Sequence, residues 1–95
     1  MEKKLDISVI SPVFNEVDNL ETFVESVTEV MNSINMSWEL IIVDDGSDDG
    51  SSKILKKIGH QENIRSILLS KNYGQTTAIQ AGFDNAVGEY FVTLD

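Results

Sequence analysis

Residues 39–43 read Glu-Leu-Ile-Ile-Val and run directly into Asp44-Asp45-Gly46-Ser47. The first run is nearly continuous in apolar side chains, most of them β-branched, which is typical of a strand buried on both faces. The acidic stretch after it contains a glycine and predicts a turn at the end of that strand. The sequence therefore predicts a central strand in a sheet that is covered on both sides.

Three further strand-like runs lie around this segment. They are rich in β-branched or aromatic residues and cover residues 7–10, 64–69 and 90–94. Between the runs, apolar residues recur at spacings of three and four, which predicts helices over residues 17–34, 54–58 and 78–86. Strands that alternate with helices imply a parallel sheet with right-handed crossovers. We therefore expect an α/β fold with the order β-α-β-α-β-α-β.

Four residues mark the expected helix ends. Asp18 is placed to cap the first helix, and Glu21 follows three residues later, as in a capping box. Gly59 and Gly88 follow the second and third helical patterns, where C-terminal glycines are common.

Size and composition restrict the class of protein. A chain of 95 residues is long enough for one small domain. Its formal net charge of −9 repels phosphate backbones and argues against nucleic-acid binding. The chain has no cysteine, which excludes disulfides and thiolate metal sites. It lacks an apolar leader and a membrane-length apolar run, so a cytoplasmic location is expected.

Polar residues gather after the strands and are much scarcer before them. Ligands bind beyond the carboxyl ends of the strands in open parallel sheets, so this asymmetry predicts a binding edge. The segments are Ser11–Glu16, Asp44–Gly50, Ser70–Gln75 and Asp95. Each has a structural alternative, because Pro12 and Asn15 are also turn formers and the acidic segment could be a turn followed by a helix cap.

The residues at this edge suggest how an acidic site could hold an anion. Neither the Gly-x-Gly-x-x-Gly fingerprint nor a Walker-type loop is present. Asp45 can accept a hydrogen bond from a base or a ribose, and Glu16 from a ribose. Asp95 can ligate a hard divalent cation that bridges to a diphosphate.

Together these segments resemble glycosyltransferase family 2 of the GT-A fold. The resemblance rests on segments 7–16, 43–50, 72–82 and 88–95, in order and at the family's spacing. It implies a three-layer, Rossmann-like parallel sheet in the strand order 3-2-1-4. Within the family, the Pro-Val-Phe-Asn-Glu form of residues 12–16 and the segment 69–74 are most similar to the polyprenyl-phosphate glycosyltransferases, such as dolichyl-phosphate mannose synthase.

The resemblance implies a function and a set of site residues. The expected function is inverting transfer of a sugar from a UDP- or GDP-sugar to a polyprenyl phosphate, with Mg²⁺ or Mn²⁺ as cofactor. Asp95 opens the family's Asp-x-Asp motif and is the expected metal ligand, and no residue is assigned as catalytic. The expected nucleotide-sugar-binding residues are Pro12, Val13, Phe14, Asn15, Glu16, Asp44, Asp45, Lys71, Asn72, Gly74 and Asp95.

The sequence stops at Asp95, before a second aspartate of that motif. We interpret residues 1–95 as the N-terminal, nucleotide-sugar-binding part of a longer domain, inactive alone. The parent enzyme could be anchored at the cytoplasmic face of a membrane. Exposed apolar surface is expected to favour a homo-oligomer or a domain-swapped association of this piece.

Three other interpretations stay open. A family 2 enzyme could instead act on a saccharide hydroxyl for cell-wall or surface polysaccharide. A receiver-like signalling module is also α/β with an acidic pocket, but its paired carboxylates usually follow the first strand rather than the second. The third is a non-catalytic oligomerisation module.

Overall fold

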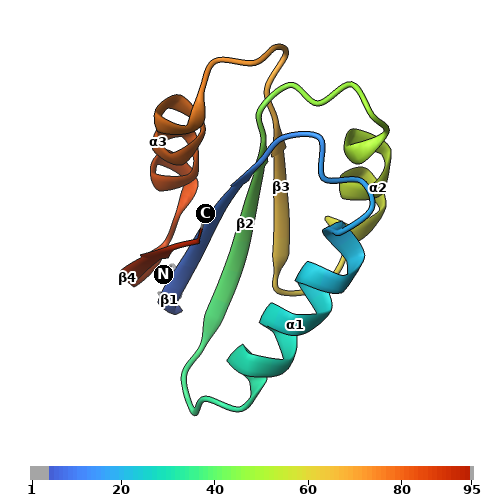
Figure 1. Ribbon diagram of the computed structural model, residues 1–95. Coiled ribbons are helices and arrows are strands. Elements are labelled where there is room, and N and C mark those ends of the chain that lie inside the picture. Colours follow the sequence, from blue (N-terminus) through green and yellow to red (C-terminus); the bar gives the residue numbers. More distant parts are fainter. Residues whose placement is uncertain (1–4, 95) are drawn as a thin grey trace.

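The computed structural model describes residues 5–94. Over that range strands and helices alternate strictly (Figure 1). The elements are β1 (Leu5–Val13), α1 (Leu20–Asn32), β2 (Trp38–Asp44), α2 (Ser51–Ile58), β3 (Ile64–Leu68), α3 (Gln75–Asn85) and β4 (Gly88–Thr93). The predicted order of elements is confirmed, although β1 and β4 begin two residues earlier than the apolar runs that predicted them.

The four strands form one parallel sheet in the order β3-β2-β1-β4. This confirms the predicted strand order 3-2-1-4. Helices α1 and α2 cover one face of the sheet and α3 covers the other, which gives three layers (Figure 1). The register pairs Val13 with Asp44, and Asp44 with Leu68, so these three strands end side by side.

The central strand β2 is buried along its whole length. Leu40 and Ile42 pack in the core beneath α1 and α2, whereas Ile41 and Val43 pack in the core beneath α3. Alternate residues of a strand point to opposite faces, so one apolar run supplies both cores. The prediction of a strand covered on both sides is confirmed.

The N-terminus of α1 differs from the prediction. The helix begins at Leu20, the capping position belongs to Asn19, and no side chain caps it. The Glu16 carbonyl instead accepts hydrogen bonds from the Asn19 and Leu20 N–H groups, at 2.9 and 3.0 Å. Asp18 is therefore not the cap, because the chain reaches the helix through a turn closed by backbone groups.

The predicted role of Gly88 was also wrong. Helix α3 ends at Asn85 with Ala86 as its C-cap, and Gly88 is the first residue of β4. A Cβ on Gly88 would lie 2.5 Å from the Ser8 backbone nitrogen. The glycine thus allows β4 to approach β1 closely. Gly59 follows the last residue of α2, as predicted.

A buried polar network lies at the amino ends of the strands, where the sequence predicted little. The Glu39 carboxylate accepts hydrogen bonds from the Ser8 hydroxyl (2.6 Å) and the Val87 N–H (2.8 Å). Its other oxygen lies 3.4 Å from Nε of Arg65. Ser8 Oγ also accepts the Gly88 N–H at 2.8 Å. The network joins the start of β4 to β1 and β2, so it has a structural role that periodicity alone did not indicate.

The helices are short compared with the thickness of a bilayer. They contain 13, 8 and 11 residues, against about 20 apolar residues for a membrane span. Over residues 5–94, no helix has the length and apolar character needed to cross a membrane.

Candidate nucleotide-binding site

Three loops meet at the carboxyl edge of the sheet, after β1, β2 and β3, at the top of Figure 1. Residues of these loops line a cavity of about 260 Å³ that is open to solvent. Its lining residues are Pro12, Val13, Phe14, Asp45, Asn72, Gly74 and Gln75. All except Gln75 belong to the set predicted from the sequence. Gln75 belongs to the predicted binding-edge segment Ser70–Gln75 but was not assigned as a site residue; in the structure it is the first residue of α3.

Asp45 holds the third loop against the second. Its Oδ1 accepts the Tyr73 N–H at 2.8 Å, and its Oδ2 accepts the Gly74 N–H at 2.9 Å. The Asn72 amide donates to the Asp45 carbonyl oxygen and to Oδ2, both at 3.2 Å. The carboxylate therefore fixes the chain that leads into α3.

This arrangement leaves the carboxylate of Asp45 with limited capacity for a ligand. A carboxylate offers about four lone-pair positions, and three donors already bind here, two of them to Oδ2. Asp45 is only 4% exposed, yet it lines the cavity. Oδ1 accepts one of these donors and Oδ2 accepts two, so Oδ1 is the less occupied oxygen in these contacts.

Gly46 allows the second and third loops to touch. Its φ is +75°, a conformation that favours glycine. A Cβ at this position would lie 2.2 Å from the Lys71 carbonyl carbon and 2.5 Å from the Asn72 nitrogen. The Asp-Gly pair in the sequence therefore serves both the turn and the close approach of the loop that lines the cavity.

Phe14 forms a wall between two cavities. It lines the 260 Å³ cavity together with Pro12 and Val13, and the same three residues line a neighbouring cavity of about 220 Å³. Glu16 lines only the second cavity. The aromatic side chain of Phe14 is 45% exposed, so a ring is presented to solvent between the two hollows.

Four predicted site residues do not line the cavity beside Asp45. The side chain of Asp44 is buried and accepts a hydrogen bond from the Ser47 hydroxyl. Asn15 is bonded to the loop after β2, and Glu16 Oε2 accepts the Asn19 amide at 3.0 Å. The Lys71 ammonium lies 5.3 Å from the centre of the Tyr73 ring.

Asp49 is an anchor of the loop after β2 that sequence reasoning did not assign. Its Oδ1 accepts the Ser51 hydroxyl at 2.5 Å and the Ser51 N–H at 3.0 Å, and its Oδ2 accepts the Val17 N–H at 3.1 Å. The bond from the Ser51 hydroxyl, with smaller contributions from the backbone donors, lowers the pKa of Asp49 below its ordinary value, against a smaller opposing effect of burial. The anionic carboxylate is therefore the form that the folded loop favours.

The expected metal ligand, Asp95, lies outside the described residues. Within residues 5–94, no group of three or more His, Cys, Asp or Glu side chains is arranged to hold a metal ion. The preceding residue is placed, because the Leu94 N–H donates to the Ile10 carbonyl at 2.9 Å. Strand β4 thus continues beside β1 toward the carboxyl edge.

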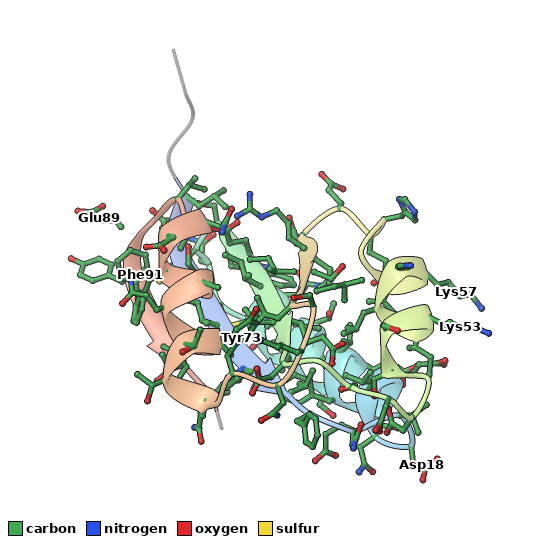
Figure 2. The ribbon with its side chains drawn as sticks, turned by 90° about the horizontal axis from the view of Figure 1, so that it is seen from above. Asp18, Lys53, Lys57, Tyr73, Glu89 and Phe91 are labelled. Atoms are coloured by element: carbon green, nitrogen blue, oxygen red, sulfur yellow. The ribbon has the colours of Figure 1, made fainter. Side chains whose placement is uncertain are left out.

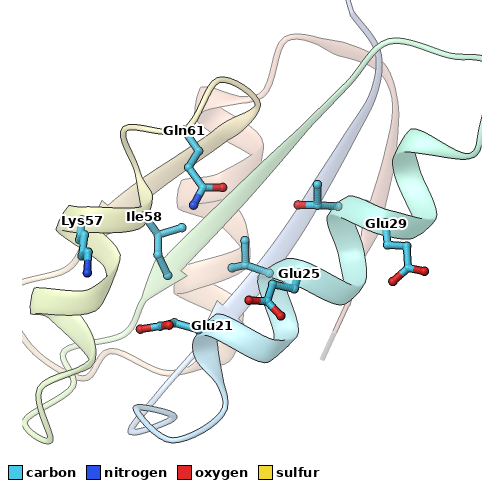
Figure 3. A pocket seen from close by; sticks show the side chains of 8 residues that line it. Glu21, Glu25, Glu29, Lys57, Ile58 and Gln61 are labelled. Carbon is cyan, nitrogen blue, oxygen red and sulfur yellow. The ribbon is translucent and has the colours of Figure 1, made fainter.

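A larger cavity, of about 440 Å³, lies between α1 and α2 (Figure 3). Glu21, Glu25 and Glu29 follow one another along α1 on one side, and Lys57 projects from α2 on the other. This groove is lined by none of the predicted site residues. We therefore place the candidate site at the smaller cavity, where buried backbone and carboxylate groups converge.

Figure 2, seen from above, shows the third loop between the outward-facing side chains of α2 and those of β4. Tyr73, an exposed residue of the third loop, lies near the middle of this view, whereas Lys53 and Lys57 project outward from α2. Phe91 and Glu89 lie on the outside at β4. The ring of Phe91 packs edge-on against Phe83 of α3, with centroids 5.3 Å apart.

A sequence profile described as "Glycosyl transferase family 2" matches residues 8–95. The chain belongs to this family. One relative, an undecaprenyl-phosphate 4-deoxy-4-formamido-L-arabinose transferase of Pectobacterium atrosepticum, is 41% identical over 92 residues, which are 95% of this chain and 28% of that protein. A Salmonella choleraesuis protein of the same description is 40% identical over 91 residues, or 94% of this chain and 28% of that protein. The chain thus spans less than a third of the length of these relatives.

Two solved structures share the fold. The mannosyltransferase PcManGT of Pyrobaculum calidifontis, solved with GDP-Man and Mn²⁺, has a TM-score of 0.75 at 20% identity, over 92% of this chain and 26% of that one. TarS of S. aureus has a TM-score of 0.69 at 23% identity, over 95% of this chain and 16% of that one. These likenesses confirm the predicted GT-A-like architecture.

Proposed function

We propose that the carboxyl-edge cavity binds the nucleoside diphosphate part of a nucleotide-sugar donor. The observation that carries this proposal is the combination of an apolar wall with a buried, partly occupied carboxylate. Pro12, Val13 and Phe14 offer contact surface for a flat base, and Oδ1 of Asp45, which accepts fewer of the loop donors than Oδ2, would accept a donor of the base or ribose. Family membership supports a nucleotide-sugar ligand at this edge.

The proposed reaction is inverting transfer of the sugar to a polyprenyl phosphate. Relatives with about 40% identity are undecaprenyl-phosphate sugar transferases, which favours a lipid phosphate acceptor. A phosphate acceptor is already anionic near neutral pH and needs no strong general base. This agrees with the carboxyl edge of the sheet, where the buried carboxylates of Asp44 and Asp45 both accept hydrogen bonds from the loops. The acceptor is a membrane lipid, so the reaction would take place at a membrane surface, for which the cytoplasmic face remains our prediction.

The proposal includes a divalent cation, for which Asp95 would be a ligand. The PcManGT structure contains Mn²⁺, and β4 leads the chain toward the same edge as the cavity. A bound Mg²⁺ or Mn²⁺ would neutralise the charge of the leaving diphosphate. Lys71 lies in the third loop, next to Asn72 of the cavity lining, and would contribute positive charge toward that diphosphate. We further propose that residues 1–95 are the nucleotide-binding part of the longer protein.

The test is a transfer assay with the natural full-length protein. Labelled UDP- and GDP-sugars are offered with undecaprenyl phosphate, with and without Mn²⁺, for the wild type and for Asp95→Ala. We expect metal-dependent labelling of the lipid by the wild type and its loss in the variant. Labelling of a saccharide hydroxyl instead would favour the other acceptor class, and the absence of any transfer would contradict the proposal.

A further inference from the structure

The loop that carries Phe14 is held by side chains of the loop after β2. Regular pairing between β1 and β2 stops at Val13 and Asp44, and the last backbone bond joins the Asp45 N–H to the Val13 carbonyl at 2.9 Å. Beyond that point the two segments diverge, the first toward α1 and the second toward α2. Their further contacts are made by polar side chains.

Asn15 and Ser47 are the centre of these contacts. The Asn15 N–H donates to Ser47 Oγ at 2.8 Å, and Asn15 Oδ1 accepts the Asp48 N–H at 3.0 Å. The Ser47 hydroxyl donates in turn to the buried Asp44 carboxylate. Asn15 therefore bonds to the opposite loop as both donor and acceptor, which fixes its backbone and its side chain together.

Two further bonds extend the same contact. The Glu16 N–H donates to Ser51 Oγ at 3.2 Å, and the Val17 N–H donates to the Asp49 carboxylate at 3.1 Å. Three consecutive N–H groups of one loop thus donate to side chains of the other loop and of the first residue of α2. The two loops are joined residue by residue, although neither is part of the sheet.

The backbone of Asn15 is consistent with this role. Its φ is +52°, and within residues 5–94 it is the one non-glycine residue with a positive φ. Asparagine tolerates this conformation better than most residues, which adopt it at a cost. The conformation turns the chain immediately after Phe14, so it determines where the ring of Phe14 is presented.

We propose that Asn15 and Ser47 are positioning residues that clamp the two loops together and hold Phe14 as the wall of the nucleotide cavity. The inference rests on the proposed function, because the cavity is the site that Phe14 lines. It assigns to Asn15 an indirect role, through Phe14, in place of a direct nucleotide contact. Asp44 has the same kind of role, because its carboxylate orients the Ser47 hydroxyl.

Two measurements on the 95-residue chain test the clamp. Amide hydrogen exchange reports the opening of each loop, and NMR titration with UDP and with GDP reports the dissociation constant. The variants are Asn15→Ala, Asn15→Gly, Ser47→Ala and the Asn15→Ala/Ser47→Ala double variant. Val24→Ala is the control, because Val24 is buried core of α1 and its loss leaves every loop contact in place.

The clamp predicts coupled effects. Either alanine variant should speed exchange in both loops and raise the dissociation constant about tenfold, as expected for the loss of one or two hydrogen bonds. The double variant should be no worse than the single ones, since each breaks the same unit. Both Asn15→Gly and Asn15→Ala keep the backbone N–H donor and lose the side-chain acceptor. Glycine adopts the positive φ of this position without strain, so the loss of affinity should be smaller in Asn15→Gly than in Asn15→Ala. Val24→Ala should lower the stability and leave the dissociation constant unchanged.

Contrary results separate the clamp from the proposed function. Exchange that rises in only one loop, or affinity that falls no more in Asn15→Ala than in Val24→Ala, would overturn the clamp. A wild-type chain that binds neither nucleotide would contradict the proposed function. In that case hydrogen exchange alone would test the clamp. The clamp is supported if the variants speed exchange in both loops, and it is refuted if they do not.

Discussion

Gly46 and Gly50 share a left-handed backbone conformation, but their surroundings differ. A Cβ on Gly46 would collide with backbone atoms of Lys71 and Asn72, whereas on Gly50 its nearest neighbour would be the Val17 side chain at 3.7 Å. Replacement of either glycine by alanine introduces similar conformational strain. The two positions therefore form a matched pair in which one variant adds a collision.

We predict that Gly46→Ala is destabilised more than Gly50→Ala, by about 1–3 kcal/mol, the usual range for forced overpacking. The 71–74 loop must move to admit the methyl group, so nucleotide affinity should also fall in Gly46→Ala. Urea unfolding and nucleotide titration of both variants measure these effects. Equal stability and affinity in the two variants would show that the close approach of the two loops has no consequence.

The lowered pKa of Asp49 predicts a dependence of stability on pH. A carboxyl group whose pKa is lower in the folded than in the unfolded state stabilises the fold above the unfolded value, about 3.9. That stabilisation is lost as pH falls through the folded value. Asp49→Asn should therefore unfold at lower urea concentration than the wild type at pH 7, and the difference should shrink below about pH 4.

Asp48→Asn is the matched control for this prediction. Asp48 is the exposed neighbour, and it contacts the other loop through its backbone N–H, which the substitution keeps. The difference in unfolding midpoint between Asp48→Asn and the wild type should be small at pH 7 and should change little below about pH 4. A deficit of Asp49→Asn that persists unchanged at low pH would mean that charge is not the cause.

At the scale of elements, helix α3 packs closely against β1 at Gly82. A Cβ on Gly82 would lie 2.4 Å from Cγ2 of Ile10, a side chain with no exposed surface. Alanine favours a helix by up to about 1 kcal/mol over glycine, but overpacking costs about 1–3 kcal/mol. We predict that Gly82→Ala is destabilised, as measured by urea unfolding.

A double-mutant cycle tests the cause of that loss. Ile10→Ala removes the atom that the new methyl group would meet, so Gly82→Ala should cost less in the Ile10→Ala background than in the wild type. Thr77→Ala, at an exposed position of the same helix, serves as the control and should not couple with Ile10→Ala. Additive effects of Gly82→Ala and Ile10→Ala would contradict the packing explanation.

The exposed apolar residues at strand β4 indicate that the chain self-associates in solution. Val87, Tyr90, Phe91 and Val92 are between 43% and 62% exposed, at the edge of the sheet. Exposed apolar edge strands promote association. We predict concentration-dependent self-association by sedimentation, weakened by Tyr90→Lys because a charge on an edge strand opposes pairing. Glu89→Lys, which exchanges one charge for another on the same strand, is the control. A monomer at all concentrations would contradict this prediction.

For the molecule as a whole, the sequence predicted the elements better than the contacts between loops. The run 39–43 predicted a strand with two buried faces, and alternation predicted the parallel sheet; both are confirmed. The roles of Ser47 and Asp49 could not be predicted, because hydrogen bonds between loops follow from three-dimensional proximity and leave no periodic signal. Glu39 was missed for a related reason, since a single charged residue before an apolar run is commonly a strand boundary.

The central claim is that nucleotide binds at the carboxyl edge of the sheet. Amide chemical shifts of the isotopically labelled chain, titrated with UDP and with GDP, test it most directly. We predict shifts at the amides of Val13, Phe14, Asp45 and Gly74, which line the 260 Å³ cavity, and none at Thr28 or Gln61 in the groove between α1 and α2. Shifts confined to that groove, or a spectrum that neither nucleotide changes, would contradict the account.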